Sequence, residues 1–203
     1  MAGEELYNEG SRELQDRFDT RRIADRLEEV TVHDRFAEGD RQTIESAAMF
    51  FLATADADGW PDVSYKGGLP GFVRVVGDDT LAFPNYDGNG MYKSWGNVLL
   101  NPKVGLLFIV WGEHPHRMRV QGTATIHHDD PLLPEYPGAQ FIVRVKAERI
   151  FPNCPRYIHK MELKEYSIFA PRPDYKPPVP DWKKMDVFRD ALPERDRMEM
   201  TGE

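Results

Sequence analysis

Hydrophobic and polar positions change their period part of the way along the chain. Up to residue 48 the apolar residues recur at roughly helical spacing within a charged background, which predicts polar, amphipathic helices. This stripe consists of Leu14, Phe18, Ile23, Leu27 and Val30. A further helix is predicted from Asp40 to Ala48, with Asp40 as its N-cap and Thr43 as the alternative. We expect these helices to pack on a core formed by the rest of the chain.

From Met49 onward the apolar positions form short runs, several of which alternate with polar positions. Strands are predicted at 49–55, 60–66, 72–76, 80–84, 104–111, 117–127 and 140–151. Turn signals such as Asp56-Ala-Asp-Gly59 separate them. One short helix, at 91–100, interrupts the series. About seven short strands with a single helix predict an all-β barrel or sandwich, because a parallel α/β sheet needs a helix after nearly every strand.

The chain turns polar and irregular after Phe151. Five prolines lie between positions 171 and 180, and they predict an extended connector. A short helix is predicted at 181–192. We therefore divide the chain into an N-terminal helical extension (1–39), a barrel (40–160) and a proline-rich C-terminal extension with a short helix (161–203).

Composition narrows the classes of protein that the chain belongs to. Its net charge of −8 argues against sequence-independent nucleic-acid binding, which requires lysine and arginine to neutralise phosphates. No apolar stretch approaches the length of a membrane span. The start, Met-Ala-Gly-Glu-Glu-Leu, lacks the basic and apolar regions of a signal peptide. The only cysteine is Cys154, which fits a reducing compartment. We expect a cytoplasmic protein that binds neither nucleic acid nor membrane.

The segment from Asn85 to Asn97 is the first candidate site, because a glycine-rich turn there leads into the predicted helix. Backbone N–H groups at a helix start bind anions, so those near Asn89, Gly90 and Met91 are candidates for holding a phosphate, with Lys93 and Ser94. The alternative is a capped helix, with Asp87 or Asn89 as the cap, whose glycines only make a tight turn. The glycines match neither the P-loop nor the dinucleotide fingerprint.

The predicted helix at 91–100 is amphipathic. Helical spacing places four apolar residues on one face, which we expect to pack on the barrel. They are Met91, Trp95, Val98 and Leu99. Lys93, Ser94 and Asn97 lie away from this stripe.

A second candidate segment is Asp62 to Gly67. Alternation along a strand places Asp62, Ser64 and Lys66 on one face. That face is either solvated or lines a concave site, and Gly67 would let a ligand approach the backbone.

Two other groups of residues are candidate sites. The histidine pair at 114 and 116 lies in a loop with no cysteine or carboxylate at ligand spacing beside it, and this pair and the pair at 127 and 128 are interpreted as strand-end turns, so no metal site is predicted. Cys154 has Arg156, His159 and Lys160 nearby, which could activate a thiol. A buried, inert cysteine in a proline-fixed loop is the favoured interpretation.

The chain resembles a known family over residues 40–160. The resemblance lies in the runs 51–61, 64–75, 80–90, 94–108 and 119–124. These runs resemble the pyridoxamine 5′-phosphate oxidase-like, FMN-binding split-barrel family. The resemblance implies a mainly β fold, an antiparallel six-stranded split β-barrel with peripheral helices. It also implies a homodimer with one FMN per subunit in a groove at the dimer interface, and flavin redox chemistry on a small-molecule substrate.

Carried over to this sequence, the resemblance assigns Ser64 and Lys66 to the strand that meets the flavin, and the segment from Asn85 to Ser94 to its phosphate and ribityl chain. The candidate cofactor-binding residues are Ser64, Lys66, Gly67, Asn85, Asn89, Gly90, Met91, Lys93, Ser94 and Asn97. No catalytic residue is assigned.

The sequence departs from the family in two places. An arginine-lysine pair near the phosphate is replaced by Ser94 and Trp95, so Lys93 is the expected substitute and a deazaflavin is an alternative cofactor. The arginine-rich C-terminal end of true pyridoxamine 5′-phosphate oxidases is absent, so that activity is not predicted. The predicted function is an FMN-dependent oxidoreductase, and the alternative is a flavin or other cofactor-binding or sensor protein without turnover. We expect the proline-rich tail to wrap the partner subunit.

Overall fold

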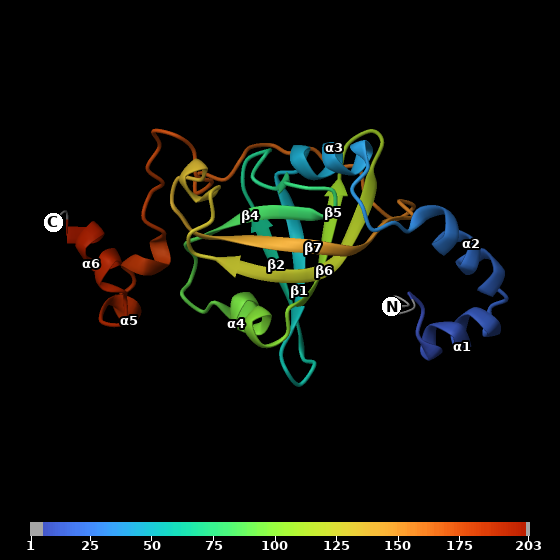
Figure 1. The fold of residues 1–203 in the computed structure, drawn as a ribbon. Helices are drawn as coiled ribbons and strands as arrows, with labels where there is room; N and C mark the ends of the chain where they lie inside the picture. Colours follow the sequence, from blue (N-terminus) through green and yellow to red (C-terminus); the bar gives the residue numbers. More distant parts are fainter. Residues whose placement is uncertain (1–5, 202–203) are drawn as a thin grey trace.

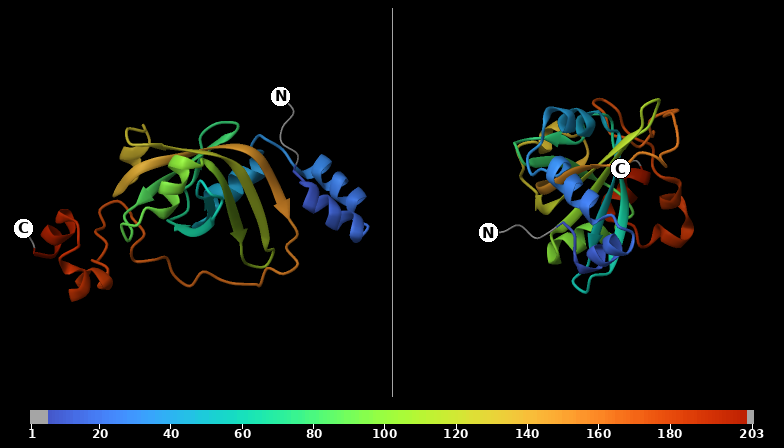
Figure 2. Two further views of the ribbon diagram at one scale, coloured as in Figure 1. Left: turned by 90° about the horizontal axis from the view of Figure 1, so that it is seen from below. Right: turned by 90° about the vertical axis from the view of Figure 1, so that its right-hand side faces the viewer.

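Seven strands form one antiparallel sheet, in the order β2-β1-β5-β6-β7-β4-β3, in the computed structural model (Figure 1). The structure describes residues 6–201, so the residues that predict the absence of a signal peptide lie largely outside it. The strands are β1 (Met49–Ala55), β2 (Pro61–Gly67), β3 (Arg74–Val75), β4 (Thr80–Tyr86), β5 (Lys103–Val110), β6 (His116–His127) and β7 (Ala139–Asn153). The sheet curls around a core (Figure 2), which confirms the mainly β split barrel.

The number of strands agrees with the hydrophobic pattern and exceeds by one the six that the family resemblance implied. The additional strand is β3, which is only two residues long and pairs with β4 at the edge of the sheet. A tight turn makes this short pairing possible, since the Val76 N–H donates to the carbonyl of Thr80 at 2.9 Å. β2 and β3 are the two outer strands, so pairing does not close the barrel.

The predicted hairpin between β1 and β2 is confirmed. The strands pair in register from Met49 opposite Gly67 to Ala55 opposite Pro61. Asp56 stabilises the turn, because its Oδ1 accepts from the N–H groups of Asp58 and Trp60 at 3.1 and 2.9 Å. Gly59 adopts a φ of 87°, which glycine reaches without steric cost. The hairpin thereby fixes which face of β2 its alternating polar residues occupy.

Aromatic rings fill the centre of the core. The ring of Phe50 lies 4.9 Å from Phe83, 5.2 Å from Phe108 and 5.9 Å from Phe72, measured between centroids. Phe50, Phe83 and Phe108 are fully buried, and burying one such side chain contributes about 1.5–3 kcal/mol. This cluster ties β1, β4 and β5 together around the core.

The N-terminal helices differ from the expectation. Helices α1 (Glu9–Arg17) and α2 (Arg21–Thr31) project from one end of the barrel (Figures 1 and 2). The predicted apolar stripe does not pack on the core, since its five residues are 48–68% exposed. The two helices are joined instead by polar contacts, including Arg12 to Asp25 at 2.5 Å. Tyr7, which precedes α1, donates from its hydroxyl to the Ala24 carbonyl at 3.2 Å. The prediction of amphipathic helices is therefore confirmed, and the prediction that they pack on the core is wrong.

Helix α3 (Glu38–Ser46) starts earlier than predicted. The N-cap position is Ala37 and not Asp40. Asp40 lies inside the first turn, where its carboxylate accepts from the Ala37 N–H at 2.9 Å and contacts His33 Nε2 at 2.7 Å. An acidic side chain that reaches back from this position satisfies the same free backbone donors as an N-cap. Thr43 lies within the helix and donates to the Gly39 carbonyl at 2.9 Å.

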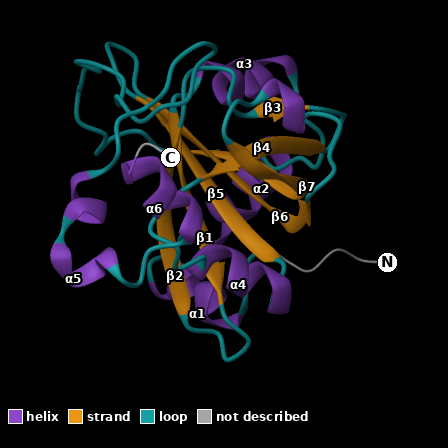
Figure 3. Cartoon of the chain, turned by 90° about the vertical axis from the view of Figure 1, so that its left-hand side faces the viewer, coloured by secondary structure: helices purple, strands orange, loops and turns teal. Residues whose placement is uncertain are grey.

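The C-terminal extension returns along the barrel. After β7 and its preceding 3₁₀ turn η1 (Leu133–Glu135), residues 154–180 run as an extended segment to the opposite end (Figure 2). The predicted helix at 181–192 is divided into η2 (Asp181–Lys184) and α5 (Asp186–Arg189), and α6 (Glu194–Thr201) was not predicted (Figure 3). Pro193 precedes α6, and proline suits the start of a helix because it needs no N–H partner there.

Within residues 6–201, no helix combines the length and the apolar content needed to cross a bilayer.

Candidate functional site

A groove of about 1390 Å³ collects residues from β2, from the segment between β4 and helix α4 (Lys93–Leu100), and from the C-terminal extension. Every predicted cofactor-binding residue except Asn97 lines it. Those lining residues are Ser64, Lys66, Gly67, Asn85, Asn89, Gly90, Met91, Lys93 and Ser94. Residues predicted from two separate segments thus meet at one place.

The polar face of β2 forms one wall of the groove. Asp62, Ser64 and Lys66 all line it and are partly buried. Their positions on the strand follow from the hairpin register, in which Ser64 is opposite Leu52 and Lys66 is opposite Phe50. The face therefore lines a concave site, which was one of the two interpretations of its alternation.

Lys66 is the cation of this wall, and its surroundings shift its pKa. Its Nζ lies over the indole of Trp95, 4.6 Å from the ring centroid. Burial lowers the pKa of Lys66, and the neighbouring Asp62 carboxylate opposes that effect. The indole face attracts the ammonium group, so Trp95 holds the charge in place although burial disfavours it.

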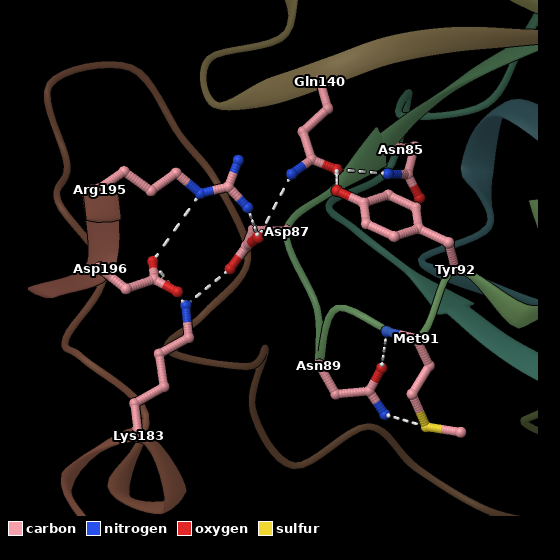
Figure 4. Close-up of polar contacts among 9 residues, drawn as sticks. All are labelled: Asn85, Asp87, Asn89, Met91, Tyr92, Gln140, Lys183, Arg195 and Asp196. Atoms are coloured by element: carbon pink, nitrogen blue, oxygen red, sulfur yellow. Dashed lines mark hydrogen bonds and ion pairs between the residues drawn. The ribbon is translucent and has the colours of Figure 1, made fainter. Parts of the chain in front are cut away.

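Trp95 is itself held by a chain of amides. Its Nε1 donates to Asn85 Oδ1 at 2.5 Å, and Asn85 Nδ2 donates to Gln140 Oε1 at 2.8 Å. Gln140 Oε1 also accepts from the Tyr92 hydroxyl at 3.0 Å (Figure 4). Asn85 is buried, and these bonds make it a positioning residue for Trp95. A direct contact of Asn85 with a cofactor stays a prediction.

Gln140 was missed by the sequence analysis. It lies in β7, 55 positions after Asn85, and nothing in its local sequence marks it as a site residue. Only the pairing of β4 with β7 places it beside Asn85.

Helix α4 begins at Lys93, two residues later than predicted. Its N-cap position is Tyr92, which has a φ of 46° and no side-chain capping bond. Asn89 Oδ1 accepts from the Met91 N–H at 3.1 Å, so Asn89 stabilises the turn before the helix and does not cap it. Asp87 does not cap the helix either. The Met91 N–H is therefore already bonded within this turn.

The sides of α4 are also placed differently. Trp95 and Val98 are buried as predicted, whereas Met91 and Leu99 are exposed. Ser94 and Asn97, predicted to lie away from the barrel, are buried.

The two buried polar residues Ser94 and Asn97 of α4 face polar groups of β2 and β1. Asn97 Nδ2 donates to Thr54 Oγ1 at 3.0 Å, and Ser94 Oγ lies 3.5 Å from Asp62 Oδ2. Lys93 Nζ donates to Asn97 Oδ1 at 3.2 Å. Asn97 thus holds Lys93 at the groove and does not line it.

Asp87 joins the glycine turn to the C-terminal extension. Lys183 Nζ contacts its Oδ2 at 2.8 Å, and an Nη of Arg195 contacts its Oδ1 at 2.7 Å (Figure 4). Lys183 also pairs with Asp196 at 3.0 Å. Burial lowers the pKa of Lys183, but the bonds from Asp87 and Asp196 outweigh it and raise the pKa overall. The sequence pattern of this region predicted only a connector and a short helix, and neither Lys183 nor Arg195 was predicted as a site residue.

The groove carries positive charge within an acidic chain. Five cationic residues line it against three carboxylates, which leaves an excess of two positive charges, whereas the whole chain carries −8. The cations are Lys66, Lys93, Lys176, Lys183 and Arg195, and the carboxylates are Asp62, Asp87 and Asp196. This balance favours an anionic ligand.

Cys154 lies elsewhere. It is exposed, which overturns the favoured expectation of a buried thiol, and the groove lining does not include it. Arg156 Nε lies 3.1 Å from its Sγ, and hydrogen bonds from Arg156 lower the pKa of the Cys154 thiol.

The chain is similar to known proteins in both sequence and structure. A protein family described as pyridoxamine 5′-phosphate oxidase matches residues 36–167, well over half of the chain. No curated protein matches the chain.

Several solved structures are similar. A candidate pyridoxamine 5′-phosphate oxidase from Lactobacillus delbrueckii has 26% identity and a TM-score of 0.47, over 59% of this chain and 95% of that one. An FMN-binding protein from Syntrophomonas wolfei has 14% identity and a TM-score of 0.44, over 70% and 97%. The heme storage protein HutZ from Vibrio cholerae has 17% identity and a TM-score of 0.43, over 58% and 94%. With TM-scores below 0.5, these similarities do not bear on the chemistry of the groove.

Proposed function

The chain belongs to the pyridoxamine 5′-phosphate oxidase family, and on that basis we propose that it binds FMN in the groove and acts as a flavin-dependent oxidoreductase on a small molecule. The observation that carries the proposal is the convergence of Ser64, Lys66, Lys93 and Ser94 on one groove. One strand, β2, and one helix, α4, position these side chains.

The donors of the groove fit a flavin phosphate. The excess positive charge suits a phosphate dianion, and the turn at Gly88–Gly90 brings backbone close to the lining surface. The volume of about 1390 Å³ exceeds the roughly 300–1,000 Å³ of ordinary small-molecule pockets. That volume leaves space for a second molecule beside a cofactor.

Each of these groove residues would have a distinct role in binding the cofactor. Lys93 and Ser94 bind the phosphate, and Asn97 orients Lys93. Lys66 and the Gly67 N–H hold negative charge on the ring system from the β2 side, with Trp95 fixing the position of Lys66. When bound, a flavin supplies hydride and electron transfer, which the side chains do not.

We propose that the protein is a homodimer with this groove at the interface. Val63 and Tyr65 lie on the outer strand β2 and are 67% and 63% exposed, and large exposed apolar residues on a sheet edge favour a partner. The C-terminal extension lies against the groove of its own chain, and its wrapping of a partner stays a prediction. Light scattering of the full chain and of a chain lacking 171–203 tests both statements.

The central experiment is a titration of the purified protein with FMN, read by flavin fluorescence and by thermal shift. We expect saturable binding, reduction of the bound flavin by a nicotinamide donor and reoxidation by air. The Lys66→Ala variant should weaken binding and shift the flavin potential, and the exposed Lys164→Ala variant should do neither. Absence of any shift with FMN and with a deazaflavin would refute cofactor binding. Bound flavin that no donor reduces would favour the alternative, a cofactor-binding protein without turnover.

A separate assay addresses substrate class. We expect the FMN-loaded protein not to oxidise pyridoxamine 5′-phosphate. Steady turnover of that compound by the FMN-loaded protein would contradict this expectation.

A further inference from the structure

The C-terminal segment from Phe169 to Met198, here called the C-terminal arm, forms part of the groove wall. It contributes Phe169, Tyr175, Trp182, Lys183, Arg195 and Asp196 to the lining, among others. The arm reaches this position after residues 154–168 have run back along the barrel (Figure 2). The groove is therefore built by barrel residues together with an arm that lies far from them in the sequence.

The arm places its two cations beside the glycine turn. Lys183 and Arg195 converge on Asp87, which directly precedes Gly88-Asn-Gly90 (Figure 4). The Lys183 side chain is only 7% exposed. A lysine buried to this extent needs anionic partners, and Asp87 and Asp196 supply them in the protein alone.

Both cations have donors beyond these contacts. An ammonium group offers three N–H donors and a guanidinium five. Lys183 uses two of its donors for Asp87 and Asp196, at 2.8 and 3.0 Å. By contrast, the start of α4 offers a single cation, Lys93, whose ammonium group donates a hydrogen bond to the side chain of Asn97. One lysine does not balance a dianion, and Lys183 and Arg195 are the groove cations that contact Asp87, the residue directly before the glycine turn.

We propose that Lys183 and Arg195 of the C-terminal arm, together with Lys93 and the turn at Gly88–Gly90, bind a phosphate monoester group at this end of the groove. This inference rests on the proposed function in so far as the phosphate is that of FMN. Asp87 acts as the positioning residue that brings the two cations of the arm to the turn. The arm thereby sets the preference of the groove for phosphorylated over unphosphorylated ligands.

A purely structural arm would behave differently. If Lys183 and Arg195 only fastened the arm, their loss would weaken the binding of every ligand to a similar degree. If they contact phosphate, their loss weakens the binding of phosphorylated ligands, because charge-assisted hydrogen bonds to the phosphate are lost. The affinity for unphosphorylated ligands then stays nearly unchanged.

The test compares FMN, riboflavin, FAD and inorganic phosphate on the full chain. Flavin affinities are measured by fluorescence quenching, and phosphate binding is measured by thermal shift. The variants are Lys183→Gln, Arg195→Gln and the double variant. The matched controls are Lys184→Gln and Arg189→Gln, whose cations pair with nearby carboxylates of the arm, Asp181 and Asp186.

We expect each single variant to weaken FMN binding by about tenfold and to change riboflavin affinity by less than about twofold. The salt dependence of FMN binding should also fall, since fewer charges are engaged. The affinity for FAD, which has a diphosphate and no phosphate monoester, should fall less than the affinity for FMN. Both control variants should bind all ligands as the parent chain does.

Three results would overturn the proposal: an unchanged FMN affinity in the double variant, parallel losses for FMN and riboflavin, or no thermal shift by phosphate in the parent chain. Binding of no flavin by the parent chain would refute the proposed function alone. In that case a phosphate shift that disappears in the double variant would still support the arm as the anion site.

Discussion

The ammonium nitrogen of Lys66 lies 4.6 Å from the centroid of the Trp95 indole, in a partly buried position on the groove wall. A charged group is thus kept where burial disfavours it, which lowers its pKa. Such a position is typical of a residue retained for a site rather than for stability.

Substitution of Lys66 by methionine should therefore stabilise the protein in the absence of a ligand. Because the pKa of Lys66 is lower in the folded state, stability rises with pH between the folded pKa and the ordinary value near 10.5. At pH 7 the charge costs stability, so Lys66→Met should raise Tm by a few degrees. The gain should shrink as the pH approaches 10.5. Thermal unfolding followed by circular dichroism at pH 7 and 10 measures this, with the exposed Lys164→Met as the control. A lower Tm at pH 7 would contradict it.

The raised pKa of Tyr86 predicts that the protein loses stability in alkali. Burial, with a smaller contribution from Tyr136, raises the pKa of Tyr86 to about 12. The folded state then holds its proton more tightly than the unfolded state, so stability falls as the pH rises from about 10 towards 12.

The Tyr86→Phe variant has no such proton and should lose less stability between pH 9 and 11.5 than the parent chain. Urea unfolding at the two pH values measures the difference. The exposed Tyr157→Phe serves as the control. Equal losses in parent and Tyr86→Phe would show that the Tyr86 phenol does not contribute.

Gly122 allows β6 and β7 to approach closely at a register shift between Gln121 and Gly122. A Cβ added at Gly122 would lie 2.1 Å from the Lys146 carbonyl oxygen, which is backbone and cannot rotate away. We expect Gly122→Ala to destabilise the protein by about 2–4 kcal/mol, mainly through backbone displacement.

The matched substitution is Gly105→Ala in β5, where the added Cβ would lie 3.7 Å from the Ala53 Cβ, an ordinary contact. Its effect in the same urea titration should stay within about 1 kcal/mol. Similar losses at the two glycines would refute the close approach as the cause.

Asp87 should control how firmly the C-terminal arm is attached. Asp87→Asn removes the charge that both Lys183 and Arg195 contact. Limited trypsin digestion should then cut within 176–189 roughly five- to tenfold faster, because local opening becomes more frequent. Asp186→Asn, which affects one ion pair within α5, is the control. Unchanged cleavage in Asp87→Asn would show that other contacts hold the arm.

Local patterns predicted the sheet well and its surroundings poorly. The strands follow from period-two alternation and turn residues, as the hairpin at Asp56–Gly59 shows. Helical spacing identified α1 and α2 as amphipathic, but spacing does not say what covers an apolar stripe, and Leu14 and Phe18 are exposed. For α4, the start at Lys93 depends on the left-handed Tyr92, which no residue pattern announces.

The same limit applies to the groove. Ser64 and Lys66 were predicted because neighbours along one strand alternate. Gln140, Lys183 and Arg195 were not, because each meets the site across 55 to 108 positions of sequence. Contacts of this kind follow from strand order and from the path of an extended segment, and neither leaves a local mark.

The separation of Asp87 from Arg195 by 108 positions has a consequence for the order of folding. A contact between distant residues forms only after the loop entropy between them has been lost. The barrel strands fold on their own pairings, so the arm should dock last, onto an already formed glycine turn. In refolding, the buried Trp95 should therefore report barrel formation before hydrogen exchange reports protection of the arm, and the two rates should differ.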